Sequence, residues 1–170
     1  MKTVSLDIHR KMLKNNPTAF EEHFPRAREN FAKMFKGFPK NVRLQMADLV
    51  FNAQERKPLF YHESVTTGLP MVWNDPKILN LKNGKFHTWN DCNHYRYEIG
   101  HYVPKNAGGT DHPENLCFMS GRCNQHIQSS LSLDEIMDNI FPHNIEVQNR
   151  VASLKNLYNS IEWKSLKENK

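Results

Sequence analysis

The fold is decided by residues 98–126, which read EIGHYVPKNAGGTDHPENLCFMSGRCNQH. Residues 94–103 are expected to form a strand that ends at Pro104, because a proline cannot continue the hydrogen-bond ladder of a strand. Four of the seven glycines in the chain lie between Gly100 and Gly121, so the chain bends repeatedly there. We therefore expect a strand, a glycine loop, a second strand that pairs with the first, and a helix delivered beneath both.

Two residues of this stretch have the chemistry that phosphodiester hydrolysis requires. The reaction needs a base that activates water and a cation that offsets the developing charge. His101, at the end of the expected strand, can act as the base. Asn124, at the start of the expected helix, has an amide oxygen that can hold a hard cation such as Mg²⁺.

In its combination and spacing the stretch resembles the HNH, or ββα-metal (His-Me finger), endonuclease family over residues 94–130. The residues that carry the resemblance are Ile99, His101, Pro104, Gly108, Gly109, Asn115, Leu116, Cys123 and Asn124. The resemblance implies that His101 is the general base and that Asn124 is the metal ligand. It also implies that Asn115 holds the loop together through side-chain hydrogen bonds to the backbone and helps to orient His101.

Two departures from the family pattern affect the expected metal site. Many members have Asp or His as a second ligand immediately before the base, where this chain has Gly100. We therefore expect one Mg²⁺, which Mn²⁺ can replace, held mainly by Asn124, with Glu98 as an indirect, water-mediated contributor. Zinc-bearing members have the first cysteine of a Cys-x-x-Cys pair where this chain has Ser120, so a structural zinc is not expected.

Two other interpretations of the same residues stay open. A Cys₂His₂ zinc site could form from Cys92, His94, Cys123 and His126, which would make the chain a zinc-stabilised interaction module. Alternatively, Gly100 marks lost metal binding, and the finger is a degenerate element of a non-catalytic nucleic-acid-binding protein.

The charge of the chain is concentrated in its first third. Residues 1–58 carry 12 Lys and Arg against 6 Asp and Glu, whereas residues 59–170 carry 11 against 12. We interpret 1–58 as a basic helical region that contacts nucleic acid. Its candidate phosphate contacts are Arg26, Arg28, Lys33, Lys36, Lys40 and Arg43. Candidate contacts from the finger itself are Arg96, Lys105 and Arg122.

Hydrophobic spacing predicts helices over residues 3–14, 18–36 and 42–56. Short strands are expected on both sides of a turn at Thr67 and Gly68, and a hairpin is expected at Asn83 and Gly84. Ser132 and Glu135 form a capping box that opens a short helix. Asn144 opens a last helix whose expected buried stripe is Val147, Val151, Leu154, Leu157, Tyr158 and Ile161.

The sequence thus predicts an α+β protein, with a helical region over 1–58 and a ββα-metal nuclease domain with C-terminal helices over 59–170. DNA is the expected substrate and RNA the alternative, and cutting both strands would suggest a homodimer. The longest apolar run is Leu116–Met119, so no membrane contact is expected. An odd number of cysteines and the lack of an apolar export segment favour an intracellular location, in the cytoplasm or at the nucleoid or nucleus.

Overall fold

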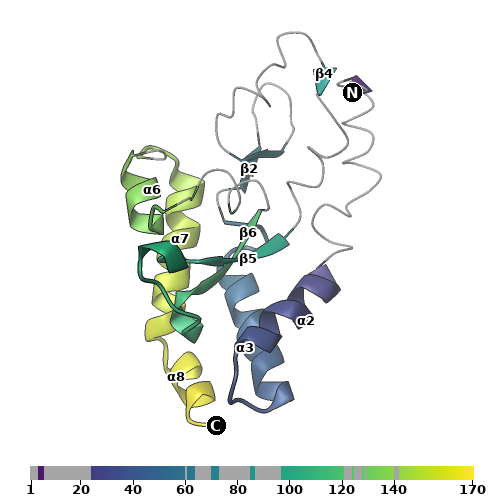
Figure 1. Cartoon of the computed structure of the whole chain (residues 1–170), viewed down its shortest axis with the longest axis vertical. Helices are drawn as coiled ribbons and strands as arrows, with labels where there is room; N and C mark the ends of the chain where they lie inside the picture. The colour runs from purple at the N-terminus through teal and green to yellow at the C-terminus, as the bar shows by residue number, and fades with distance from the viewer. Residues whose placement is uncertain are drawn as a thin grey trace.

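In the computed structural model, two groups of helices lie around one pair of antiparallel strands (Figure 1). The structure describes residues 4–5, 24–59, 61–63, 70–72, 85–86, 97–120, 124, 128, 130–139 and 142–170. Within these residues, none of the helices has both the length and the apolar character needed to cross a membrane. The mixture of helices and strands confirms the predicted α+β class.

The helical first third contains α2 (Phe24–Met34), within the segment predicted at 18–36, and α3 (Lys40–Ala53), which overlaps the segment predicted at 42–56 but begins two residues earlier and ends three residues earlier. Pro25 lies in the first turn of α2, where the missing N–H of proline costs no intrahelical hydrogen bond. The chain turns between the two helices at Gly37, whose φ of +88° favours glycine. The first helix therefore ends at Met34, two residues before the predicted end, and residues 18–23 of the prediction lie outside the described residues.

Two short strand pairs lie outside the central one. β2 (Tyr61–Glu63) pairs antiparallel with β3 (Pro70–Val72), as predicted. β1 (Val4–Ser5) pairs antiparallel with β4 (Lys85–Phe86). The helix predicted from residue 3 is wrong at these positions, because the β-branched Val4 pairs with a distant strand instead. Residues 78–82, the expected hairpin partner of β4, lie outside the described residues.

The central pair consists of β5 (Tyr97–His101) and β6 (Leu116–Ser120), joined by the predicted glycine loop. The register places Tyr97 opposite Ser120 and His101 opposite Leu116. This confirms that the loop returns the chain so that the second strand pairs with the first. β5 ends at His101, two residues before the predicted end, because Tyr102 and Val103 belong to the loop and are bonded to Asn115.

Three C-terminal helices follow, namely α6 (Leu133–Asn139), α7 (Ile145–Asn159) and α8 (Ile161–Lys167). The predicted capping box of α6 is present, with hydrogen bonds of 2.7 and 3.2 Å between Ser132 and Glu135. Asn144 caps α7 as predicted, because its side-chain oxygen accepts a hydrogen bond from the Val147 N–H at 3.1 Å.

The prediction of one continuous last helix with Ile161 in its buried stripe is wrong. Ser160 has an extended backbone and caps a new helix by accepting a hydrogen bond from the Trp163 N–H. The change of direction leaves Ile161 85% exposed and buries Trp163 completely. The Trp163 ring lies 6.1 Å from that of Phe35, so α8 packs against the helical first third.

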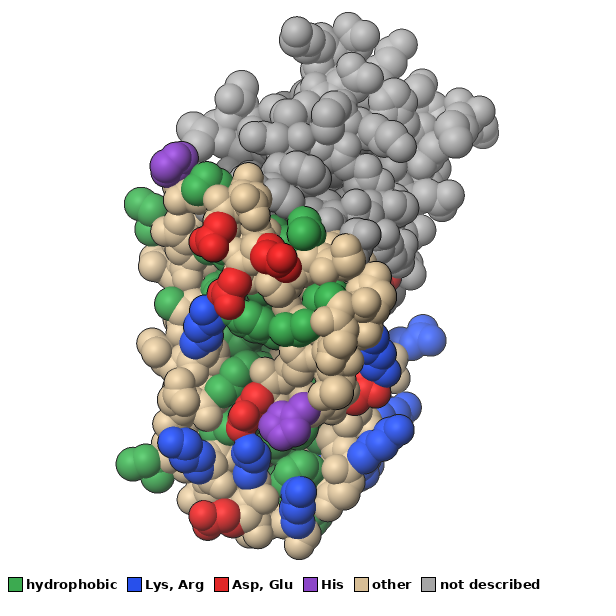
Figure 2. Space-filling model, turned by 60° about the vertical axis from the view of Figure 1, so that its left-hand side comes forward, with side chains coloured by type: hydrophobic (Ala, Val, Ile, Leu, Met, Phe, Trp, Pro, Cys, Tyr) green, Lys and Arg blue, Asp and Glu red, His purple; other side chains and the backbone are tan. Residues whose placement is uncertain are grey.

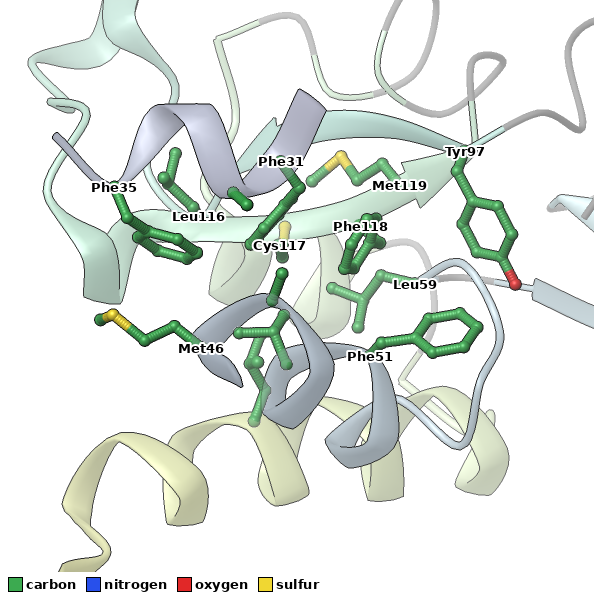
Figure 3. Close-up of a cluster of buried hydrophobic side chains, with 14 of the residues drawn as sticks. Phe31, Phe35, Met46, Phe51, Leu59, Tyr97, Leu116, Cys117, Phe118 and Met119 are labelled. Atoms are coloured by element: carbon green, nitrogen blue, oxygen red, sulfur yellow. The ribbon is translucent and has the colours of Figure 1, made fainter. Parts of the chain in front are cut away.

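One hydrophobic core joins the helical first third to the central strands (Figure 3). The ring of Phe31, on α2, stacks on that of Phe118, on β6, with 4.1 Å between their centroids. Phe51, on α3, makes edge contacts with Tyr97 and Phe118 at 5.5 and 5.7 Å. Cys117 is fully buried here, in the core position predicted for it. The core therefore crosses residue 58, where the sequence suggested a boundary.

Candidate active site

His101 lies at the end of β5, where the strand runs into the glycine loop. Its Nε2 atom is 2.9 Å from Oδ1 of Asp111, and 18% of its side chain is exposed. The other carboxylate oxygen of Asp111 accepts a hydrogen bond from the Lys105 ammonium at 2.7 Å. The loop thus brings a histidine, a carboxylate and a lysine into one chain of contacts.

The charges of this group define the hydrogen-bonding state of the imidazole. Hydrogen bonds from Lys105 and from His101 hold the pKa of the Asp111 carboxyl below its ordinary value. Asp111 is therefore ionised near neutral pH and can only accept, so Nε2 of His101 carries the proton that it donates. Within the described residues, Nδ1 of His101 has no hydrogen-bond partner. In the neutral ring this atom holds the lone pair that can accept a proton.

Asn115 closes the loop on which Asp111 lies. Its Oδ1 accepts a hydrogen bond from the Val103 N–H at 2.8 Å. Its Nδ2 donates to the carbonyl oxygens of Val103 and Thr110, at 2.9 and 2.8 Å. These are the backbone hydrogen bonds expected of Asn115, and its part in orienting His101 remains a prediction.

The closing of the loop by Asn115 also requires glycine at position 109. A Cβ atom at this position would lie 1.7 Å from the carbonyl oxygen of Val103, far inside van der Waals contact. Only glycine therefore lets the return segment approach Val103 closely enough for Asn115 to bridge the two sides. The sequence signal of the paired glycines thus has a direct steric cause.

The second part of the candidate site is the contact between Asn124 and β5. The Asn124 Nδ2 donates to Oε2 of Glu98 at 3.1 Å and to the Ile99 carbonyl oxygen at 3.4 Å. Both hydrogen bonds use the amide nitrogen, so neither occupies the amide oxygen proposed as a metal ligand. Asn124 and Glu98 line a hollow of about 290 Å³ together with Ala27, Asn30, Tyr97, Ile99 and Phe118.

This donor set fits a hard divalent cation. Amide and carboxylate oxygens are the ligands that Mg²⁺ prefers, and Mg²⁺ commonly keeps several waters. Within the described residues there is no group of three or more His, Cys, Asp and Glu side chains that could hold a metal ion. A cation at Asn124 would therefore be held by few protein ligands and would bind weakly.

The two parts of the site lie along one edge of β5. Gln128 donates a hydrogen bond to the His101 carbonyl oxygen at 2.5 Å, and Asn124 donates to that of Ile99. Carbonyls two residues apart on a strand point to the same edge and are separated by about 7 Å. The amide of Asn124 is thus held about two strand residues away from the backbone of His101.

Gly100 is the position at which the HNH resemblance would place a second metal ligand, and the space beside its Cα is filled. A Cβ atom on Gly100 would lie 2.5 Å from Cγ and Sδ of Met119, which is fully buried. The position is thus occupied by the core and cannot accept a ligand without movement of Met119. This observation favours a site with one main ligand.

Several candidate residues are not placed in the site by the structure. Arg96 and Arg122 lie outside the described residues, as do Cys92, His94, Cys123 and His126 of the alternative zinc site. Lys105 is described and 58% exposed, and its ammonium contacts Asp111. Its predicted contact with nucleic acid remains a prediction.

Two residues of the site were not selected from the sequence. Asp111 follows the paired glycines by two positions, and an acidic residue on a loop that turns back toward a histidine is a usable signal. Asn30 gave no such signal, because only the packing of α2 beside β5 brings it to the hollow. Comparison of the chain with protein-family models, curated proteins and solved structures yields no significant match.

Proposed function

We propose that this protein is a metal-dependent endonuclease that hydrolyses phosphodiester bonds of DNA with a ββα-metal active site. The observation that carries the proposal is the hydrogen bond between His101 and Asp111 at the end of β5, the strand on which Glu98 and the Ile99 carbonyl oxygen contact Asn124. A base on this strand and a cation held by a residue that contacts the same strand are the two components that the reaction requires.

In the proposed reaction His101 acts through Nδ1. This atom takes a proton from a water molecule as the water oxygen forms a bond to phosphorus and the bond from phosphorus to the leaving oxygen breaks. The leaving oxygen acquires a proton from solvent. Asp111 accepts the Nε2–H of the ring throughout, so its negative charge stabilises the imidazolium that forms.

A divalent cation at Asn124 would offset negative charge on the phosphoryl and leaving oxygens. Glu98 accepts a hydrogen bond from Nδ2 of Asn124 and so holds its amide group. The amide oxygen of Asn124, which lines the hollow with Glu98, takes no part in this contact. Asn115 keeps Asp111 within reach of His101 by fixing the loop. Each of these residues positions a group, and His101 alone moves a proton.

The alternative is a non-catalytic nucleic-acid-binding protein, and one observation favours it. Met119 fills the space in which a second metal ligand would lie, so metal affinity is expected to be low. Cleavage decides between the two functions, because the alternative predicts binding without cutting.

The test is incubation with supercoiled, linear and branched DNA, and with RNA, in Mg²⁺ or in EDTA. We expect cleavage of DNA in Mg²⁺, and a loss of about 10²–10⁴ in rate for His101→Ala with binding retained. His112→Ala is the matched control, because His112 lies in the same loop and, among the described residues, its side-chain hydrogen bond is to the Glu114 N–H. Near-full cleavage by a folded His101→Ala protein would refute the assignment.

The metal is tested separately from the base. Cleavage should require Mg²⁺ or Mn²⁺ and be abolished by EDTA, with little change in the free energy of unfolding, because a weakly held ion stabilises little. Asn124→Ala should have the same effect as EDTA, with partial rescue by excess metal. Unfolding in EDTA that zinc reverses would instead support a zinc-stabilised module.

A further inference from the structure

A second hollow lies between α2 and α3, and three of its six lining residues are cations. Its volume is about 150 Å³, and its lining residues are Glu29, Ala32, Lys33, Lys40, Arg43 and Leu44. Three positive side chains therefore face one negative side chain. On the face drawn in Figure 2, Lys and Arg side chains gather over the lower part of the molecule, the end at which α3 and α8 lie in Figure 1.

Unlike Arg28, which pairs with a carboxylate, the three cations have no carboxylate partner among the described residues. Arg28 is paired with Asp48 through two hydrogen bonds of 2.5 and 2.6 Å, so it is committed to the fold. In the described part of the chain, no carboxylate lies within ion-pair distance of Lys33, Lys40 or Arg43. The Nε of Arg43 is buried and has no hydrogen-bond partner among these residues.

A buried donor without a partner costs free energy, and an anion in the hollow would supply the missing acceptor. The guanidinium of arginine is planar and directs several N–H groups outward, which suits a phosphate group.

The start of α3 adds to the attraction for an anion. Its N-cap is Pro39, no side chain caps it, and no acidic residue lies in its first turn. Lys40, the first residue of the helix, places a positive charge at the positive end of the helix dipole. A bound anion would compensate this unfavourable arrangement, because the first N–H groups of a helix have no partner within it.

The hollow adjoins the candidate active site along α2. Lys33 contributes to the cationic hollow, and its ammonium donates to Oδ1 of Asn30 at 3.4 Å. Asn30 in turn lines the hollow that contains Glu98 and Asn124. One turn of α2 therefore separates Lys33 from Asn30 and links the two hollows.

We propose that Lys33, Lys40 and Arg43 bind one phosphate group of the nucleic-acid backbone next to the phosphate that is cut. This inference rests on the proposed function, since it assigns the substrate's neighbouring phosphate to a hollow outside the strand pair.

The first measurement uses inorganic phosphate as the probe and the Nε–H signal of Arg43 in ¹⁵N NMR spectra as the readout. Phosphate should shift this signal in the full chain, and chloride should not. The signal should be absent from Lys33→Gln/Lys40→Gln/Arg43→Gln, which identifies it as that of Arg43. Lys33→Gln/Lys40→Gln, which retains Arg43, should show a weaker shift. No shift in wild type would overturn the proposal.

The second measurement is the salt dependence of duplex DNA binding in EDTA, so that no cleavage occurs. Each neutralised phosphate contributes about 0.9 to the slope of log affinity against log salt. One phosphate shared by three cations predicts that the triple variant lowers the slope by about 0.9. It also predicts that each single variant causes most of this change, and that Arg43→Lys weakens binding although the charge is retained.

The control is Arg56→Gln/Lys164→Gln/Lys170→Gln, which removes the same charge from exposed positions outside the hollow. A slope lowered by about 2.7, with equal additive contributions from the three residues, would show independent surface contacts and overturn the proposal. So would a change no larger than that of the control. Phosphate binding without DNA or RNA binding would also overturn it.

The outcomes separate this inference from the proposed function. If the slope falls as expected but the protein cuts no nucleic acid, the phosphate site stands and the endonuclease assignment fails. If DNA is cut in Mg²⁺ and the triple variant binds like wild type, the endonuclease assignment stands and the phosphate site fails.

Discussion

Asn115→Ala is expected to destabilise the protein strongly, because one side chain makes three hydrogen bonds to the backbone of the loop. Each such bond contributes about 1 kcal/mol net, so the loss should be about 3 kcal/mol. In a chain of this size, 1 kcal/mol lowers the melting temperature by about 2–4 °C. The expected fall is therefore about 6–12 °C, measured by thermal and denaturant unfolding followed by circular dichroism.

Two further variants test the cause. Asn115→Asp keeps the acceptor for the Val103 N–H but places a carboxylate against the carbonyl oxygens of Val103 and Thr110. It should be about as destabilising as Asn115→Ala at pH 7 and recover partly below about pH 4, where a protonated carboxyl can donate. Asn106→Ala, in the exposed part of the same loop, should change stability by less than about 0.5 kcal/mol. If Asn115→Ala is as mild as Asn106→Ala, the account of loop closure is refuted.

Three other outcomes follow from the packing and the charges. Gly100→Asp should lower the free energy of unfolding by about 1–3 kcal/mol in denaturant unfolding, because its Cβ meets Met119. The loss should be smaller in a Met119→Ala background, and equal losses in the two backgrounds would contradict the steric cause. Trp163→Ala should cost about 3–5 kcal/mol and Ile161→Ala less than about 0.5, a ranking that a single continuous helix would reverse. Hydrogen bonds from a lysine and a histidine lower the pKa of Asp111 in the folded protein. The ionised Asp111 therefore stabilises the fold fully above its unfolded pKa of about 3.9. This contribution is lost as the pH falls through the lower pKa of the folded state. Unfolding measured between about pH 2 and 5 should therefore show a shallower acid dependence for Asp111→Asn than for wild type, and parallel curves would argue against the ion pair.

Features that depend on nearby residues could be predicted from the sequence. The Ser132 and Glu135 box and the Asn144 cap each join residues three positions apart, so the pattern specifies the hydrogen bonds directly. The pairing of β5 with β6 belongs to the same class, because a loop with paired glycines joins two strands of similar length. The hydrogen bonds from Asn115 to the loop backbone were expected from the resemblance to the HNH family.

Packing between distant segments decided the remaining features. Phe31 and Phe35 lie in a segment that hydrophobic spacing predicted to be helical, but that spacing did not show that Phe118 and Trp163 are their partners. The sequence likewise did not show that Met119 fills the space next to Gly100, since this depends on the rotamer of a side chain on the opposite strand.

The contents of the two hollows differ in the same way. The sequence identified Glu98 and Asn124 as neighbours in the site, but Asn30 joins them only because α2 packs beside β5. Six basic residues of the first third were equivalent in sequence, and the structure commits Arg28 to Asp48 while it gathers Lys33, Lys40 and Arg43 around one hollow. The physical reason is that caps and short loops are made by directional hydrogen bonds between near neighbours. Burial of apolar surface has no direction, so the whole chain must fold before distant faces are assigned to one another.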